Sequence, residues 1–134
     1  MGFLMDGRTM ASLSPTQRTL RLLRQEGCLC GIVERFNTFA GPIVKGRRVG
    51  IRQDLFQFID IVAILPIGIC GVQSCGQAFS EHNKKILENE IAPEWLKAGG
   101  FIYLYGWRKL VKRRGLKQKI WSPRIKEYTL EDFE

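Results

Sequence analysis

Phe56-Gln-Phe-Ile-Asp60-Ile-Val-Ala-Ile-Leu65 is the stretch that decides the fold of this chain, because it places one carboxylate inside an apolar run. Its Ile, Val and Phe residues favour a strand with buried side chains. A carboxylate in such a strand is costly to desolvate unless it meets a cation or a hydrogen-bonding partner. Asp60 is therefore the first candidate for a functional residue, and its setting is typical of a metal-binding acid.

A second apolar run follows directly and predicts a hairpin. The turn is expected at Pro66-Ile67-Gly68, and the chain returns through Ile69-Cys-Gly-Val-Gln73-Ser-Cys75. We expect the first strand to extend from about Asp54 or Phe56 to Leu65. Adjacent antiparallel strands would then bring the side chains of Asp60 and Gln73 together.

The remaining elements are predicted by working outward from this hairpin. Ser14-Pro15 is an N-cap signal and Gly27 an end signal, while Gly99-Gly100 closes a later helix that restarts at Pro93. Between them lies a mobile, basic connection from Gly41 to Gly50, whose Arg47 and Arg48 could reach a phosphate backbone. The expected elements are a helix over 14–27, strands over 28–36, 54–65 and 69–75, a helix over 80–98 and a strand over 101–107.

The charge of the whole chain indicates a polyanionic partner. In 134 residues, 21 Lys and Arg stand against 13 Asp and Glu, which gives a formal net charge of +8. This balance favours nucleic acid, through phosphate contacts and counterion release, although a basic protein without such a partner has the same composition. The length suits a single domain over residues 1–134, and the broken apolar run and the N-terminus predict no membrane span and no export.

The strongest cationic segment follows the last predicted strand. We expect it to contact DNA, with Trp107 and Trp121 as platforms for a base or a sugar. The alternative is a solvated charged turn that leads to a final hairpin, through Lys119–Trp121 and Arg124–Tyr128, with Ser122-Pro123 between the strands. The cations of the segment are Arg108, Lys109, Lys112, Arg113, Arg114, Lys117 and Lys119.

Taken together, these residues resemble the PD-(D/E)XK nuclease superfamily, and within it small resolvase-like or restriction-like members common in bacteriophage genomes. The resemblance covers roughly residues 14–110. It implies an α/β fold with a restriction-endonuclease-like mixed sheet of about four strands between helices, in the order αβββαβ, followed by a basic C-terminal extension of about 108–134 with a β-hairpin. It rests on Arg52-Gln-Asp54-Leu-Phe-Gln-Phe-Ile-Asp60-Ile-Val-Ala, Gly71-Val-Gln73-Ser-Cys75, Lys84-Lys85-Ile86 and Tyr105-Gly-Trp107-Arg-Lys109.

The resemblance also implies a site that binds Mg²⁺ or Mn²⁺. Asp60 matches the first acid of the motif and Gln73 its Asp or Glu position, and the main-chain carbonyl of Ser74 would be a further oxygen ligand. Glu34 lies where an acid from the first helix or strand completes the metal site in many members, and Asp54 is a weaker candidate. These residues supply the hard oxygen atoms that such ions prefer.

Two positions depart from the superfamily pattern. Gln73 offers a carbonyl oxygen without negative charge, for which Glu34 would compensate. Cys75 stands where the motif has lysine, and an ordinary thiol is neutral at pH 7 and a poor Mg²⁺ ligand. Lys85, or failing that Lys84, would supply the missing cation from the following helix. His82 is expected to be a surface residue or a phosphate contact in preference to a general base.

Three functions follow as hypotheses. The first is a divalent-metal-dependent DNA endonuclease that acts on branched or structured DNA, like a Holliday junction resolvase, or on a duplex site. In it Asp60, Gln73, Glu34 and Lys85 are the catalytic residues, and a homodimer in the cytoplasm of a bacterial or phage-infected cell is expected by analogy. The second is a catalytically inactive nuclease-fold protein that binds DNA through Arg47, Arg48, Lys84 and the cationic segment. The third is an RNA-associated or assembly protein.

Overall fold

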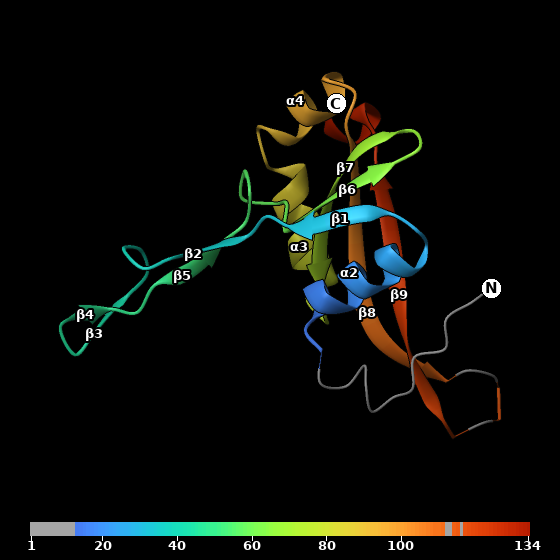
Figure 1. Cartoon of the computed structure of the whole chain (residues 1–134), viewed down its shortest axis with the longest axis horizontal. Helices are drawn as coiled ribbons and strands as arrows, with labels where there is room; N and C mark the ends of the chain where they lie inside the picture. The colour runs from blue at the N-terminus through green and yellow to red at the C-terminus, as the bar shows by residue number, and fades with distance from the viewer. Residues whose placement is uncertain (1–12, 112–113, 116) are drawn as a thin grey trace.

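The core of the protein is a five-stranded mixed sheet in the order β1-β6-β7-β8-β9 (Figure 1). The computed structural model describes residues 13–111, 114–115 and 117–134. The strands are β1 (Leu29–Ile32), β6 (Ile61–Leu65), β7 (Gly68–Cys75), β8 (Phe101–Val111) and β9 (Lys119–Tyr128). All neighbouring strands are antiparallel except β7 and β8, which are parallel. The predicted α/β class with a mixed sheet is confirmed.

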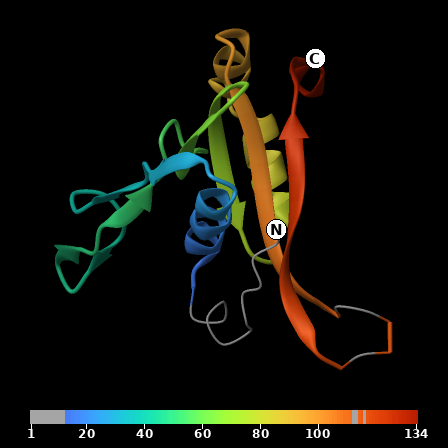
Figure 2. The ribbon, with the colours of Figure 1, turned by 45° about the vertical axis from the view of Figure 1, so that its right-hand side comes forward.

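Helices cover both faces of this sheet (Figure 2). On one face, α2 (Pro15–Gln25) packs Leu20 and Leu23 against alternate residues of β6 and β7. The other face carries α3 (Phe79–Leu87) and α4 (Ala92–Lys97), whose Ile86 and Ala92 are fully buried. A short 3₁₀ helix, η1 (Leu130–Phe133), follows β9. No helix of the described residues is long and apolar enough to cross a membrane.

Local signals account for where α2 begins. The Ser14 side chain accepts a hydrogen bond from the Gln17 N–H at 3.2 Å, and Pro15 occupies the first helical position. The Ser14 side chain satisfies one N–H group of the first turn, and Pro15 has no N–H that would need a partner. Both features are expected from the sequence. The helix therefore starts where its cap predicts.

The strand expected to start at Asp54 or Phe56 is shorter than predicted. Leu55 and Ile59 form an isolated bridge around a tight turn, in which Phe56 and Gln57 have positive φ of 53° and 70°. This turn reverses the chain before the sheet begins, so β6 starts only at Ile61. The apolar side chain of Phe58 in the turn is nevertheless fully buried, which explains why the sequence pattern resembles a continuous strand.

The basic connection after the first strand forms an arm that projects from the body (Figure 1). We define the arm as residues 35–53. It contains β2 (Arg35–Asn37) paired with β5 (Ile51–Gln53), and β3 (Ile43–Val44) paired with β4 (Arg47–Arg48). Gly50 has φ +76° and packs against Phe36, where a Cβ would lie 2.5 Å from the ring. The connection predicted from Gly41 to Gly50 thus contains the β3–β4 ribbon, and the β2–β5 ribbon joins it to the body (Figure 1). The strand predicted over 28–36 is divided between β1 and β2.

The C-terminal segment is a strand of the main sheet. β9 pairs with β8 along its whole length, from Ile102↔Tyr128 to Val111↔Lys119. The turn predicted at Ser122-Pro123 is wrong, since Pro123 lies within β9. Proline is tolerated there because β9 is the last strand of the sheet, where an N–H is not needed on the outer side. The hairpin predicted within the C-terminal extension is therefore formed by β8 and β9. Its second strand, β9, is the edge strand of the main sheet.

Thr19 links α2 to the centre of the sheet. Its fully buried hydroxyl accepts hydrogen bonds from Ser74 Oγ and Trp107 Nε1, both at 2.8 Å, and donates to the Pro15 carbonyl at 3.1 Å. Ser74 is adjacent in sequence to Gln73, so this network supports the strand that carries a candidate site residue.

We expect Thr19→Val to lower the free energy of unfolding by roughly 2–4 kcal/mol, because two buried donors lose their acceptor while the shape is kept. Urea denaturation followed by tryptophan fluorescence measures this change. Thr19→Ser is the control, since it retains the hydroxyl and is expected to lose less. Equal stability of the valine and serine variants would contradict this account of the network.

Candidate metal centre

Asp60 lies between the Leu55–Ile59 turn and β6, in register with both neighbouring strands. Its N–H donates to the Val72 carbonyl at 2.9 Å, and its carbonyl accepts from the Val33 N–H at 3.0 Å. These bonds fix the backbone so that the carboxylate points toward β7. The side chain is only 2% exposed.

The carboxylate of Asp60 meets Gln73, as the predicted hairpin requires. Asp60 Oδ2 accepts hydrogen bonds from Gln73 Nε2 at 3.0 Å and from the Ser74 N–H at 2.9 Å. The other oxygens of the pair, Asp60 Oδ1 and Gln73 Oε1, are buried and have no hydrogen-bond partner among the described residues. Unpaired buried oxygens are rare in folded proteins, and a cation would satisfy both.

Two further acids complete a cluster around Asp60. Glu34 lies just after β1 and Asp54 just after β5, so they enter from the two ends of the arm. One carboxylate oxygen from each of Glu34, Asp54 and Asp60 lies within 4.8 Å of the others. Ligands on opposite sides of one Mg²⁺ are about 4.2 Å apart, so small side-chain movements would bring all three oxygens into range of a single ion.

The electrostatics of this cluster favour a proton or a metal ion. Burial, together with the charges of Asp54 and Glu34, raises the pKa of Asp60 to about 8, against the lowering effect of the hydrogen bonds from Ser74 and Gln73. The pKa of Glu34 is also raised, by burial and then by Asp54, while Arg52 lowers it. Without a cation, Asp60 is therefore largely protonated at neutral pH.

Lys85 and Lys84 lie in different surroundings. Lys85 Nζ is 3.6 Å from Asp54 Oδ2, which places its ammonium beside the acid cluster. Lys84 instead faces Glu88 at 3.8 Å on the exposed side of α3. Of the two lysines predicted as the replacement for the motif lysine, Lys85 is the one that lies beside the acid cluster.

Ser74 and Cys75 have distinct environments on β7. The N–H and C=O of one strand residue point toward the same neighbour, so the Ser74 carbonyl faces the side of Asp60, where a metal ligand is predicted. Cys75 packs in the core between the sheet and α3. Burial, and then Asp60, raises the pKa of Cys75 to about 11, so the thiol is neutral and supplies no charge to the site.

His82 is half-buried on α3, and its Nδ1 has no hydrogen-bond partner among the described residues. Burial and then Lys85 lower its pKa, against the smaller raising effects of Asp54 and Glu81. The imidazole is therefore neutral at pH 7, and its expected role as a surface residue or a phosphate contact stays a prediction. Its neutral ring, whose pKa responds to burial and to the charges of Lys85 and Asp54, can accept a proton or a hydrogen bond.

A cavity of about 570 Å³ lies beside the acid cluster, between the base of the arm and α3. Its size falls within the roughly 300–1,000 Å³ range of small-molecule sites. Its walls combine cations with an aromatic ring and an acid of the cluster. The residues that carry this chemistry are Arg35, Arg52, Lys85, Phe56 and Asp54.

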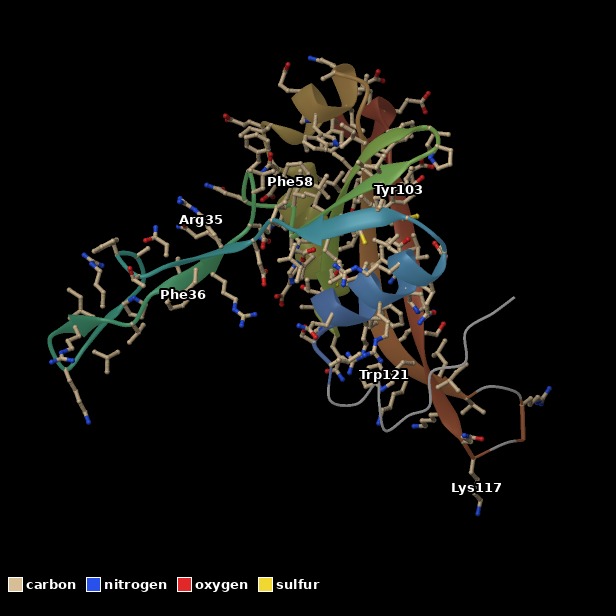
Figure 3. The ribbon with its side chains drawn as sticks, viewed as in Figure 1. Arg35, Phe36, Phe58, Tyr103, Lys117 and Trp121 are labelled. Carbon is tan, nitrogen blue, oxygen red and sulfur yellow. The ribbon has the colours of Figure 1, made fainter. Side chains whose placement is uncertain are left out.

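The predicted nucleic-acid contacts lie on two separate projections. Arg47 and Arg48 lie in the arm, and the described cations of the cationic segment lie along the β8–β9 hairpin, whose Lys117 is far from Arg35 in Figure 3. Arg108, Lys109, Arg114 and Lys117 are exposed. Lys112 and Arg113 lie outside the described residues. Lys84 is exposed on α3. The role of all these residues as nucleic-acid contacts stays a prediction.

The two tryptophans predicted as base platforms are already occupied. Trp107 is 3% exposed and donates to Thr19 from the core. The ring of Trp121 is half-buried, with the Arg18 guanidinium 3.6 Å from its centroid and Lys109 Nζ on it at 5.2 Å. Burial of an aromatic ring in a sheet and stacking on a base both select the same residue type, so sequence could not separate them.

Sequence reasoning missed Arg35, Arg52 and Phe56 as cavity residues and gave Asp54 little weight. The signal was present but indirect: Glu34 and Asp54 flank a segment that contains neither Asp nor Glu. Pairing of Arg35 with Gln53 closes that segment and brings its two flanking acids together. A contact across so many residues becomes visible only when the pairing is known.

Comparisons of the chain with protein-family models, with curated proteins and with solved structures find no match. The structure alone therefore defines the class of this protein. It is a mixed α/β protein with a buried pair of an aspartate and a glutamine, Asp60 and Gln73, in its sheet. Two acids, Glu34 and Asp54, reach this pair from the ends of the basic arm.

Proposed function

We propose that this protein is a Mg²⁺- or Mn²⁺-dependent DNA endonuclease of the PD-(D/E)XK type. The observation that carries the proposal is that carboxylate oxygens of Glu34, Asp54 and Asp60 lie within 4.8 Å of one another. In addition, Asp60 Oδ1 and Gln73 Oε1 are buried and have no hydrogen-bond partner in the described part of the chain. With the strands of the arm and the short helix α4 set aside, the order α2, β1, β6, β7, α3, β8 supports a restriction-endonuclease-like core, since it matches the αβββαβ order expected of that fold. The substrate class is branched or otherwise structured DNA, as for a Holliday junction resolvase, or a duplex site.

The residues present fit a hard divalent cation. Glu34, Asp54 and Asp60 offer carboxylate oxygens, and the Gln73 Oε1 and the Ser74 carbonyl offer neutral ones. The three acids supply the negative charge that Gln73 lacks. A bound Mg²⁺ would make a water molecule more acidic and neutralise charge on the scissile phosphate.

The chain itself supplies positioning and charge around that ion. Lys85 can orient the attacking water or stabilise charge on the phosphate, since its ammonium lies next to Asp54. Arg35 and Arg52 line the adjoining cavity, where they can hold a neighbouring phosphate. The arm and the β8–β9 hairpin carry cations for longer-range contacts with the DNA backbone, and a homodimer would allow two strands to be cut.

A catalytically inactive DNA-binding protein is the second candidate, and the environment of Cys75 favours it. The position that carries lysine in the motif holds a buried, neutral thiol, and the second motif acid is Gln73. A protein that has lost turnover would retain the basic projections and the acid cluster as a structural remnant.

Incubation of the purified protein with four-way, flapped and linear DNA, and with duplex RNA, distinguishes these functions. The expected result is cleavage of at least one DNA substrate under Mg²⁺ or Mn²⁺ and none in EDTA, because phosphodiester hydrolysis at the site needs the cation. Isothermal titration of Mn²⁺ into the protein alone is expected to give one site. DNA binding in EDTA without product under Mn²⁺ would favour the inactive protein, and preference for RNA would contradict both candidates.

A further inference from the structure

The arm has the charge and exposure of a DNA-contacting element. Residues 35–53 contain five Lys and Arg and no Asp or Glu. Within the described part of the chain, its strands pair with each other and with no strand of the main sheet. Because the arm projects from the body, a partner molecule can contact its cations without being blocked by the rest of the protein (Figure 1).

Apolar side chains on the arm are also exposed. Phe39 is 87% exposed, and Ile43, which pairs with Arg48 of β4, is 62% exposed. A second copy of this chain is a poor partner for this surface, because a twofold contact would bring like charges together. Duplex DNA matches both properties, since phosphates neutralise the cations and apolar side chains can contact sugars or bases in a groove.

The two ends of the arm hold two of the three acids of the candidate metal centre. Glu34 immediately precedes β2 and Asp54 immediately follows β5, and Arg52 in the arm contacts Glu34 at 3.4 Å. Asp60, in contrast, is fixed by hydrogen bonds to the neighbouring strands of the main sheet. An ion held by all three acids would therefore join the base of the arm to the sheet.

We propose that the arm grips a DNA duplex next to the cleaved bond, and that binding of a divalent cation at Glu34, Asp54 and Asp60 is coupled to this grip. The inference rests on the proposed metal site. The ion restrains the base of the arm, so the arm cations are already placed when DNA arrives. Coupling is reciprocal: DNA that holds the arm in this position strengthens binding of the ion by the same factor.

Ca²⁺ is the probe for this coupling, because it accepts oxygen ligands in flexible geometry. Anisotropy of a short fluorescent duplex is measured at fixed ionic strength, with Ca²⁺ and with EDTA, and a gel checks that the duplex stays intact. For the unmodified protein, Ca²⁺ is expected to raise duplex affinity about tenfold. Titration of Ca²⁺ with and without unlabelled duplex should give the same factor.

Two matched double variants separate the arm from the rest of the basic surface. Lys45→Asn with Arg47→Gln removes two exposed cations from the arm, and asparagine suits the positive φ of 51° at position 45. Arg108→Gln with Lys117→Gln removes two from the β8–β9 hairpin. Both variants should bind DNA more weakly. In the arm variant, Ca²⁺ is expected to raise duplex affinity by less than about threefold, whereas in the hairpin variant the rise should stay about tenfold.

The outcomes distinguish this inference from the proposed function. Equal coupling in both variants would mean that the ion acts by direct contact with a phosphate, which overturns the role of the arm and leaves the metal site intact. A protein that binds neither Ca²⁺ nor Mn²⁺ without DNA would overturn the proposed function itself. Light scattering completes the test, because an arm variant that changes the oligomeric state would assign the arm to a second copy of the chain.

Discussion

Replacing Asp60 by Asn is expected to abolish metal-dependent cleavage, with a loss of at least about 1,000-fold in the single-turnover rate, since the site would lose its most buried charged ligand. The exchange keeps the shape of the side chain. The amide oxygen of the variant side chain can still accept hydrogen bonds from Gln73 and the Ser74 N–H, which reach Asp60 Oδ2 at 3.0 and 2.9 Å. Loss of activity would then report the loss of charge and not a collapse of the hairpin.

The same substitution is expected to stabilise the metal-free protein at high pH. The folded-state pKa of Asp60 is raised to about 8, whereas the unfolded value is about 3.9. Between these values the folded state binds more protons than the unfolded state, so the free energy of unfolding falls as pH rises. In EDTA at pH 8, we expect the free energy of unfolding of Asp60→Asn to be about 2–5 kcal/mol higher than that of the unmodified protein. Near pH 5 the difference should be smaller.

Urea unfolding at both pH values, in EDTA and with Mn²⁺, checks this prediction. Mn²⁺ is expected to raise the stability of the unmodified protein at pH 8 and to leave that of Asp60→Asn nearly unchanged, because the ion replaces the proton on the carboxylate. Glu34→Gln is a useful comparison, since burial and Asp54 also raise the pKa of Glu34. A variant that cleaves DNA at the normal rate, or that is less stable than the unmodified protein at pH 8, would refute the assignment of Asp60.

The hairpin that holds Asp60 and Gln73 could be predicted because its determinants are local. A single turn signal, Pro66-Ile67-Gly68, separates two apolar runs, and antiparallel pairing then sets which residues meet. The start of α2 is local in the same way. Lys85 was predicted from the resemblance as a cation from the following helix. It lies 3.6 Å from Asp54, and its role at the site stays a prediction.

The parts that sequence did not predict depend on distant pairing. Asp54 joins the cluster because the arm closes through Arg35 and Gln53, and nothing near Asp54 in the chain indicates that partner. Pro123 reads as a turn residue, yet it lies in β9, because pairing along β8 outweighs the local preference where no N–H is required. Phe58 likewise extends the apolar pattern of β6 although it belongs to a turn.

Lys85→Met is expected to lower the single-turnover cleavage rate by about 100-fold or more, because the site would lose the cation that replaces the motif lysine. Methionine keeps most of the aliphatic length of the side chain, so helix α3 should be retained. Duplex affinity, measured in Ca²⁺, should fall by less than about tenfold, since one exposed phosphate contact among many contributes little. A fall in rate at saturating DNA therefore separates chemistry from binding.

The controls decide between Lys85 and the other lysines near it. Lys97→Met makes the same change on α4, where Lys97 contacts Glu94 at 3.4 Å, and should leave the rate unchanged. Lys84→Met tests the alternative source of the cation, since Lys84 faces Glu88 on the exposed side of α3. If Lys84→Met were the variant that lost the rate, the helix would have to rotate in the complex with DNA. If neither substitution lowered the rate, the assignment of a lysine from α3 would be wrong, and Arg35 or Arg52 in the adjoining cavity would be the next source of positive charge.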